Sequence, residues 1–402
     1  MTIQTSLGDI FQTYASERPI FKEKDTLSIK FTPENIPHRE KQLKQVALIL
    51  APLLRNEKPS NIFIYGKTGS GKTLVVRSVV DNLLGTINKN STPVKIFYIN
   101  CKMKKITDTE YRLLAQLISN FGEEVPYTGL PTNEVYKRFY ELLDRENQNV
   151  VLILDEIDAL VKKIGDGILY NLTRINQELE KTKLTLIGIS NNLSFVDELD
   201  PRVRSSLSEE EIIFPPYNAN ELRDILTERS NLAFNPGVIS PKVVAKCSAL
   251  AAQEHGDARR ALDLLRIAGE IAERKNSKSV DEIHVDTAES KLDTDRILEI
   301  LRTQPKQSQM VFKAILGLHK KGETNIQTGD VYDIYTNICA KNNLNPLTQR
   351  RVSDLIAELD MFGVINAKVL SKGRYGRTKR IKVNLPKSLI ENIEGSILRE
   401  FF

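Results

Sequence analysis

The residues whose types and spacing point most directly to chemistry form one loop, Gly66-Lys67-Thr68-Gly69-Ser70-Gly71-Lys72-Thr73. Their order fits the phosphate-loop pattern G-x-x-x-x-G-K-[ST] at every fixed position. Glycines let a backbone wrap around phosphate groups without a side-chain clash. We expect Lys72 to reach the β- and γ-phosphates of ATP or ADP, and the Thr73 hydroxyl to hold Mg²⁺.

The segments on either side of this loop fit the same interpretation. Residues 61–65 are apolar and β-prone, which predicts a buried strand, and residues 74–80 begin a helix. The N-terminus of a helix offers free N–H groups and the positive end of the helix dipole, both of which favour a bound anion. An ordinary glycine-rich turn is the alternative, and the strand, loop and helix in register argue against it.

A pair of carboxylates follows the apolar run at residues 151–154. Such a run predicts a central parallel strand that is covered on both faces, and open α/β sheets bind ligands at the carboxyl ends of their strands. We expect Asp155 to hold the Mg²⁺ shell, directly or through water, and Glu156 to orient and polarise the attacking water. The alternative is a solvated acidic turn.

Composition limits the classes of protein that need to be considered. The chain has 402 residues, enough for two or three domains, and its hydrophobic content of 41% and charged content of 27% are those of a globular protein. No apolar run approaches the ~20 residues that cross a bilayer, and the N-terminus lacks the shape of a signal peptide. We therefore expect a cytoplasmic protein with no membrane partner. Three distant cysteines without C-x-x-C spacing argue against a zinc site.

Positive charge is concentrated at one end of the chain. Residues 295–402 contain 18 Lys and Arg against 11 Asp and Glu, whereas the whole chain has a net charge of +5. The remainder is therefore slightly acidic. This asymmetry favours a nucleic-acid-binding module joined to a nucleotide-binding one.

The basic C-terminal segment contains the pattern of a helix followed by a hairpin. Thr348 is a plausible cap for a helix over 349–362, and Gln349, Arg350 and Arg351 lie in its first turn, where a recognition helix presents side chains to bases. Two strand-like segments follow, joined by a glycine-flanked basic tip. The residues expected to contact DNA from this tip are Lys372, Arg374, Tyr375 and Arg377. A solvated basic loop is the alternative.

Two further polar residues have unusual positions. Asn191 follows the apolar strand 184–190, where its amide could sense the γ-phosphate or the attacking water. Arg259 lies in the first turn of a predicted helix, where the helix dipole disfavours a cation unless something anionic faces it. A nucleotide phosphate would satisfy that requirement.

Together these motifs resemble those of the AAA+ ATPases, and within them those of the archaeal origin-recognition and helicase-loader initiators. The resemblance rests on the loop 66–73, the acidic run 151–158, Asn191 as sensor one, Arg259 as sensor two and the C-terminal pattern. It implies an α/β AAA+ core with a parallel sheet and a phosphate loop, a helical lid and a C-terminal winged-helix domain. The implied segments are an arm at 1–30, a core at 31–216 with a helical insertion at about 105–140, a lid at 217–292 and a winged helix at 293–402.

The resemblance also implies roles for residues outside these motifs. Tyr217 and Arg229 would belong to the nucleotide pocket, and Pro37 and Arg39 would pack near the base of the bound nucleotide. In the insertion, the segment expected to contact DNA is Leu130, Pro131 and Thr132.

One position departs from the family pattern. Where the eukaryotic members have an arginine finger in the pattern R-V-x-S-R, this chain ends the run with Ser206. Either Arg202 or Arg204 takes that role, or the chain does not complete a neighbour's site in this way. The second alternative implies slow hydrolysis, with the nucleotide acting mainly as a conformational ligand.

The sequence therefore predicts an ATP-binding initiator of DNA replication that recognises duplex origin DNA and helps to load the replicative helicase. It would be a weak ATPase, act with itself or with a paralogous subunit, and be associated with the nucleoid of an archaeal-type cell. Two alternatives remain open, an ATP-switched transcription regulator and a clamp-loader-like DNA-dependent ATPase. The basic hairpin argues against the second, because clamp loaders usually carry an oligomerisation collar at that end.

Overall fold

The structure is a computed structural model, and it describes residues 19–90, 92–103, 108–126, 129–207, 209–323, 325–371, 377–383 and 385–396. These residues belong to two compact units, Met1–Val285 and Asp286–Phe402. The phosphate loop and the acidic strand lie in the first unit, and the basic C-terminal segment lies in the second.

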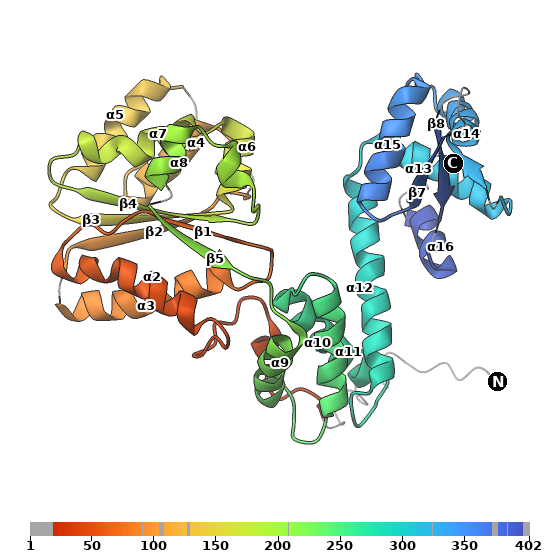
Figure 1. The fold of residues 1–402 in the computed structure, drawn as a ribbon, viewed down its shortest axis with the longest axis horizontal. Coiled ribbons are helices and arrows are strands. Elements are labelled where there is room, and N and C mark those ends of the chain that lie inside the picture. Colours follow the sequence, from red (N-terminus) through yellow and green to blue (C-terminus); the bar gives the residue numbers. More distant parts are fainter. Residues whose placement is uncertain are drawn as a thin grey trace. The chain divides into compact units, whose positions relative to one another are not determined.

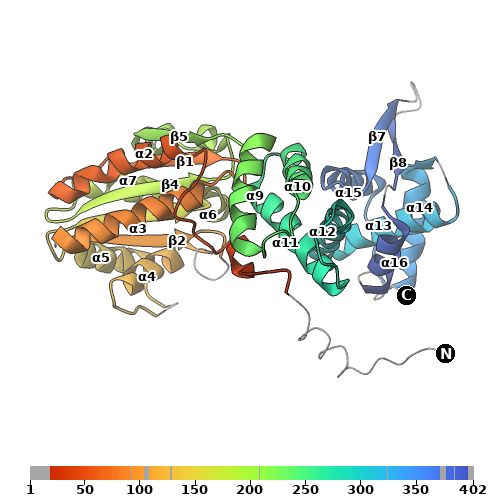
Figure 2. The same cartoon turned by 90° about the horizontal axis from the view of Figure 1, so that it is seen from below.

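A five-stranded parallel sheet forms the centre of the first unit, with the strand order β2-β3-β4-β1-β5. The strands are β1 (Ile62–Gly66), β2 (Val94–Asn100), β3 (Asn149–Asp155), β4 (Lys183–Ser190) and β5 (Glu210–Phe214). β2 and β5 form the two edges of the sheet (Figure 2). Every residue of β3 is buried, as its uninterrupted apolar run predicts. The predicted parallel α/β sheet is confirmed.

Helices cover both faces of this sheet (Figure 1). On one face lie α2 (Glu40–Leu50) and α3 (Lys72–Asn90), and on the other lie α4 (Glu110–Asn120), α5 (Thr132–Leu143), α6 (Ile157–Ile164), α7 (Gly167–Arg174) and α8 (Pro201–Leu207). A separate apolar cluster fills each side of the sheet. Helix α2 ends at Leu50, and a 3-10 turn, Ala51–Arg55, follows it. Pro52 has no N–H with which to continue the α-helical hydrogen bonds.

The predicted helical insertion consists of α4 and α5. The Thr109 side chain caps α4 by accepting from the N–H of Arg112, and Pro131 precedes α5. The apolar faces of both helices join the cluster on their side of the sheet, and Leu130 packs against it. Pro131 is exposed and Thr132 is half-buried at the start of α5.

Three helices follow the sheet and form the lid: α9 (Ala219–Ala233), α10 (Pro241–Gln253) and α11 (Ala258–Arg274). The N-terminal arm packs on them, because the Phe21 ring stacks on that of Phe234 with centroids 4.8 Å apart. Lys24, in the 3-10 helix Lys24–Leu27, pairs with Glu270 of α11 at 2.9 Å. The arm residues 1–18 lie outside the described residues.

The second unit combines helices with a small antiparallel sheet. Its elements are α12 (Glu282–Thr303), α13 (Lys306–Lys320), β6 (Ile326–Gln327), α14 (Thr328–Lys341), α15 (Gln349–Met361), β7 (Asn366–Ser371), β8 (Arg377–Lys382) and α16 (Lys387–Ser396). The strand order is β6-β8-β7, and β7 and β8 are the predicted hairpin. The winged helix is confirmed, although the expected boundary at 293 falls inside the continuous helix α12. Among the described residues, no helix combines the length and the apolar character that crossing a membrane requires.

Candidate nucleotide-binding site

The loop between β1 and α3 has a backbone that requires glycine. Gly69 and Gly71 have φ values of +72° and +93°, in the left-handed region that L side chains rarely adopt. At Gly66, a Cβ atom would lie 2.3 Å from the carbonyl oxygen of Phe214. The backbone conformation at Gly69 and Gly71 and the close contact at Gly66 therefore favour glycine at all three positions.

The Lys72 side chain bends back over this loop. It is 5% exposed, and its Nζ donates to the carbonyl oxygens of Gly66 and Lys67, both at 2.8 Å. Burial lowers the pKa of Lys72 to about 8; among charged neighbours, Asp155 opposes this shift and Arg259 adds to it. A buried cation next to a second cation is a good site for a polyanion such as a di- or triphosphate.

The buried Asp155 carboxylate, at the end of β3, accepts three hydrogen bonds. The Thr73 hydroxyl donates to its Oδ2 at 2.9 Å and the Tyr98 hydroxyl donates to the same oxygen at 2.5 Å. The N–H of Glu156 donates to Oδ1 at 2.9 Å. Thr73 and Asp155 thus lie together and offer the hard oxygen ligands that Mg²⁺ prefers, so the residues present fit this ion.

Glu156 has a strained backbone, with φ +55° in the left-handed region, immediately before α6. For a non-glycine residue this conformation costs of order 1 kcal/mol and is concentrated at functional sites. Its carboxylate forms an ion pair with Lys102 at 3.5 Å. Asn191, directly after β4, is half-buried, and its N–H donates to Asp158 Oδ1 at 3.4 Å.

The lid meets the phosphate loop at the start of α11. Asp257 caps this helix by accepting from the N–H groups of Arg259 and Arg260. The N–H of Ala258 donates to the carbonyl oxygen of Gly69 at 3.3 Å. The exposed Arg259 side chain has no hydrogen bond or ion pair with any described residue, so its charge is available to a ligand.

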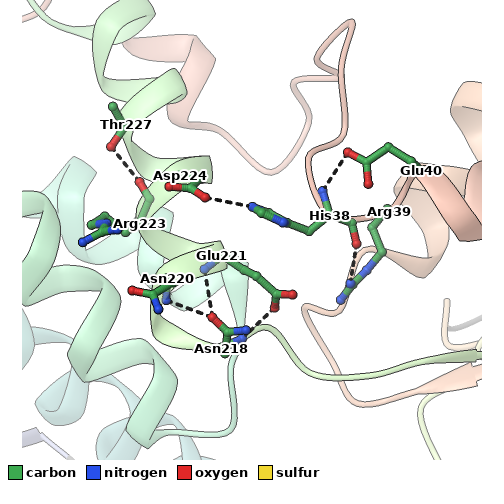
Figure 3. A network of polar contacts seen from close by, with 9 residues as sticks. All are labelled: His38, Arg39, Glu40, Asn218, Asn220, Glu221, Arg223, Asp224 and Thr227. Atoms are coloured by element: carbon green, nitrogen blue, oxygen red, sulfur yellow. Dashed lines mark hydrogen bonds and ion pairs between the residues drawn. The ribbon is translucent and has the colours of Figure 1, made fainter.

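Arg39 is nearly fully buried and joins three parts of the first unit. Its guanidinium lies 3.7 Å from the Tyr217 ring centroid and donates to the carbonyl oxygens of Ser70 and Pro215 at 2.9 and 2.6 Å. Next to it, His38 lies 3.1 Å from Asp224 of α9 (Figure 3). Burial lowers the pKa of Arg39 and raises that of Tyr217 to about 12.

A cavity of about 310 Å³ collects most of the predicted nucleotide residues. Those that line it are Pro37, Gly69, Gly71, Lys72, Thr73, Asp155, Glu156, Asn191, Tyr217, Arg229 and Arg259. The predicted residues that do not line it are Gly66, Lys67, Thr68, Ser70 and Arg39. Arg39 contacts the loop through the carbonyl oxygen of Ser70. This volume lies at the lower end of the range of small-molecule sites.

The cavity also contains residues that the sequence interpretation missed. The segment 28–33 with Asn35 forms part of the wall, as do Arg77, Tyr98 and Asn100. The sequence predicts an arm at 1–30 and assigns this segment no cavity contact, and its packing on the lid brings it to the cavity. Arg229 holds it: its Nη1 donates to the Thr26 carbonyl oxygen at 3.0 Å and its guanidinium lies 4.5 Å from the Phe31 ring centroid.

The two candidate arginine fingers lie on α8, outside the residues that line the cavity. Arg202 forms two hydrogen bonds with Asp200, each of 3.1 Å, and Arg204 pairs with Asp197 at 3.1 Å. Either arginine would have to leave its acidic partner before it could act on a neighbouring molecule.

The first turn of α15 exposes all three predicted DNA residues. Thr348 caps the helix as predicted, its hydroxyl accepting from the N–H of Arg351 at 3.4 Å. Arg351 pairs with Glu358 at 3.5 Å, whereas Gln349 and Arg350 have no side-chain partner among the described residues. Lys372, Arg374 and Tyr375 lie outside the described residues, as does the side chain of Arg377, the first residue of β8.

Comparison with known protein families divides the chain in the same order as the structure. An AAA domain family matches residues 55–195, the Cdc6 AAA+ ATPase-type lid domain matches 223–290, and the CDC6 C-terminal winged helix domain matches 299–393. The chain therefore contains an AAA domain, whose fold binds nucleotides.

Several relatives are similar over nearly their whole length. The ORC1-type DNA replication protein of Thermococcus onnurineus is 52% identical over 96% of this chain and 94% of the relative. ORC1-type DNA replication protein 1 of Methanosarcina acetivorans is 49% identical over 98% and 94%. The solved structure of the Aeropyrum pernix ORC1 protein in complex with DNA is 43% identical, with a TM-score of 0.84 over 96% of this chain and 100% of that one. This chain belongs to the family of ORC1-type DNA replication proteins.

Proposed function

We propose that this protein binds ATP or ADP with Mg²⁺ and uses the nucleotide mainly as a conformational switch in DNA replication initiation. The observation that carries the proposal is the meeting of Lys72 from the loop and Arg259 from the lid at one cavity. A phosphate chain that contacts both cations would bridge the two parts of the first unit. Loss or shortening of the phosphate chain would then remove a contact that holds the lid to the phosphate loop.

The remaining residues of the cavity fit a weak ATPase. Bound Mg²⁺ neutralises charge on the phosphates, and Thr73 and Asp155 would hold it. Glu156 would orient a water molecule as the base, and Asn191 would contact the γ-phosphate or that water. Arg202 and Arg204 would have to exchange Asp200 and Asp197 for a phosphate, which supports slow hydrolysis.

For the second unit we propose binding to duplex origin DNA. The exposed first turn of α15 would present Gln349 and Arg350 to base edges, with Arg351 next to them. The basic tip between β7 and β8 would contact phosphates or the minor groove. In the first unit, the segment Leu130, Pro131 and Thr132 at the start of α5 would add a further contact. A solved complex of an ORC1 relative with DNA supports this assignment.

We further propose that the protein helps to load the replicative helicase and acts with a second copy or a paralogous initiator. The archaeal relatives from Thermococcus onnurineus and Methanosarcina acetivorans support an archaeal-type cell in which the protein is nucleoid-associated. Mapping the sites that the protein occupies across its genome tests the role directly. Occupancy at replication start sites is expected, and occupancy at promoters alone would favour a transcription regulator instead.

The nucleotide proposal has its own test in Lys72→Ala. Titration with a fluorescent ADP should give clearly weaker binding, because the variant removes the buried charge next to the phosphates. A suitable control is Lys44→Ala, on α2, because Lys44 does not line the cavity. Equal affinities for the parent and Lys72→Ala would contradict the proposed site.

A further inference from the structure

We infer that Tyr98 is a positioning residue that orients the Asp155 carboxylate and so determines how much Mg²⁺ adds to nucleotide affinity. The inference rests on the proposed nucleotide site. The sequence motifs did not identify Tyr98, which lies on β2, the edge strand beside β3. Its hydroxyl contacts the carboxylate that follows the buried apolar run.

The register of the two strands brings Tyr98 to this carboxylate. Asn100 lies opposite Asp155 in the β2–β3 pair, and Tyr98 lies two residues earlier, opposite Ile153. Residues two apart in a strand share a face, so the Tyr98 side chain lies on the same face as that of Asn100. Both Tyr98 and Asn100 line the cavity.

The hydrogen bonds of Asp155 show what the Tyr98 hydroxyl contributes. A carboxylate accepts at about four lone-pair positions, two on each oxygen. Three donors occupy three of these positions: the hydroxyls of Thr73 and Tyr98 on Oδ2, and the N–H of Glu156 on Oδ1. One position on Oδ1 remains for Mg²⁺ or one of its waters. The Thr73 hydroxyl is itself a candidate ligand of that ion, so Tyr98 is a side-chain donor that can hold Oδ2 independently of the metal.

The Tyr98 ring is fixed from the helix that begins at the phosphate loop. The guanidinium carbon of Arg77, on α3, lies 4.6 Å from the ring centroid, within the range of a cation–π contact. The phenol hydroxyl in turn donates to Asp155 Oδ2. Ring and hydroxyl thus both have defined partners.

Groups that orient a metal ligand affect metal affinity strongly, and their removal typically costs about 10- to 100-fold. The substitution Tyr98→Phe removes the hydroxyl and keeps the ring against Arg77. We expect it to raise, about 10-fold or more, the Mg²⁺ concentration that half-saturates the metal-dependent gain in ADP affinity. The affinity for ADP in EDTA should stay unchanged, because Tyr98 acts through Asp155.

A matched control is Tyr65→Phe on strand β1 of the same sheet. The Tyr65 hydroxyl also donates to a carboxylate, Glu211 Oε2, at 3.2 Å, but Tyr65 does not line the cavity. This variant should resemble the parent both with Mg²⁺ and in EDTA. The probes are a fluorescent ADP and MgCl₂, titrated with the full-length chain.

The possible outcomes separate this inference from the proposed function. If the parent binds ADP with a Mg²⁺-dependent gain and Tyr98→Phe shows the same Mg²⁺ curve, the inference is wrong and the nucleotide site stands. If the variant loses affinity equally in EDTA and in Mg²⁺, Tyr98 has a general structural role and the inference is again wrong. If the parent does not bind ADP, the proposed function itself fails and the inference fails with it.

Discussion

Gly69 of the phosphate loop lies directly against Asp257, the residue that caps the lid helix α11. A Cβ atom on Gly69 would lie 1.8 Å from Asp257 Oδ1, well inside the closest contact that real Cβ atoms make. The next residue, Ala258, donates its N–H to the Gly69 carbonyl oxygen. The lid helix therefore begins on the loop, and a change in the loop backbone has to move the start of α11.

This contact predicts that Gly69→Ala separates the loop from the lid. The new methyl group would overlap Asp257, and φ at this position is +72°, so we expect a loss of about 1–3 kcal/mol in the free energy of unfolding. Affinity for ADP should fall as well. Denaturant unfolding and ADP titration measure the two effects.

The control for this variant is Gly85→Ala in the interior of α3. A Cβ there meets no atom within 4 Å, so the substitution should leave ADP affinity unchanged and stabilise the helix by up to about 1 kcal/mol. A Gly69→Ala variant as stable and as tight-binding as Gly85→Ala would refute the link between loop and lid.

Glu156→Gln should keep nucleotide affinity and lose ATP hydrolysis, because an amide cannot serve as the base for the attacking water. The same substitution also breaks the ion pair with Lys102. Lys102 is largely exposed, so this loss should be worth at most ~1 kcal/mol. Lys102→Ala removes the ion pair alone and should keep hydrolysis. Undiminished phosphate release by Glu156→Gln would exclude Glu156 from the catalytic role.

Local sequence patterns predicted the parts of this protein whose structure depends on residues close to one another in the sequence. The phosphate loop and the strand ending at Asp155 have fixed residue spacing and a strong apolar signal, so their positions were correct. Thr348 likewise caps the predicted helix, whose inner residues, Val352, Leu355, Ile356 and Leu359, are all buried.

The rest depends on contacts between distant segments, for which one sequence carries no signal. The stacking of Arg39 on Tyr217 joins residues far apart in the chain. The same holds for the contact between Tyr98 and Asp155. The two-residue strand Ile326–Gln327 is too short to produce an alternating pattern, yet it pairs with β8 and completes the second sheet.

Arg259→Ala should reduce the effect of the nucleotide on domain arrangement. The Arg259 side chain has no partner among the described residues and lines the cavity, so a phosphate is the contact that the substitution would remove. Small-angle scattering with and without ADP measures the response. Arg274→Ala, at the other end of α11, is a control, because Arg274 is exposed and pairs only weakly with Glu270 at 3.6 Å. A full nucleotide response in Arg259→Ala would contradict the sensor role.

In the second unit, substitutions in α15 and in the basic tip should affect DNA binding in different ways. Replacing Arg374 and Arg377 together with alanine should weaken binding to every duplex. Each lost phosphate contact should also reduce, by about one, the slope of the logarithm of the binding constant against the logarithm of the salt concentration. Arg350→Ala should instead cost about 1–3 kcal/mol at a preferred site and relax base preference there. The reason is that Arg350 is exposed in the first turn of α15 without a partner among the described residues, whereas Arg351 pairs with Glu358.

Titrations with a preferred and a scrambled duplex at two salt concentrations distinguish these effects. Arg351→Ala serves as the control within the helix, and we expect it to lose less discrimination than Arg350→Ala, because its guanidinium is already engaged by Glu358 and Asp354. Equal losses on both duplexes for Arg350→Ala would mean that α15 does not read bases. Specificity would then have to come from elsewhere, and the start of α5 in the first unit, with Pro131 exposed, would be the next segment to test.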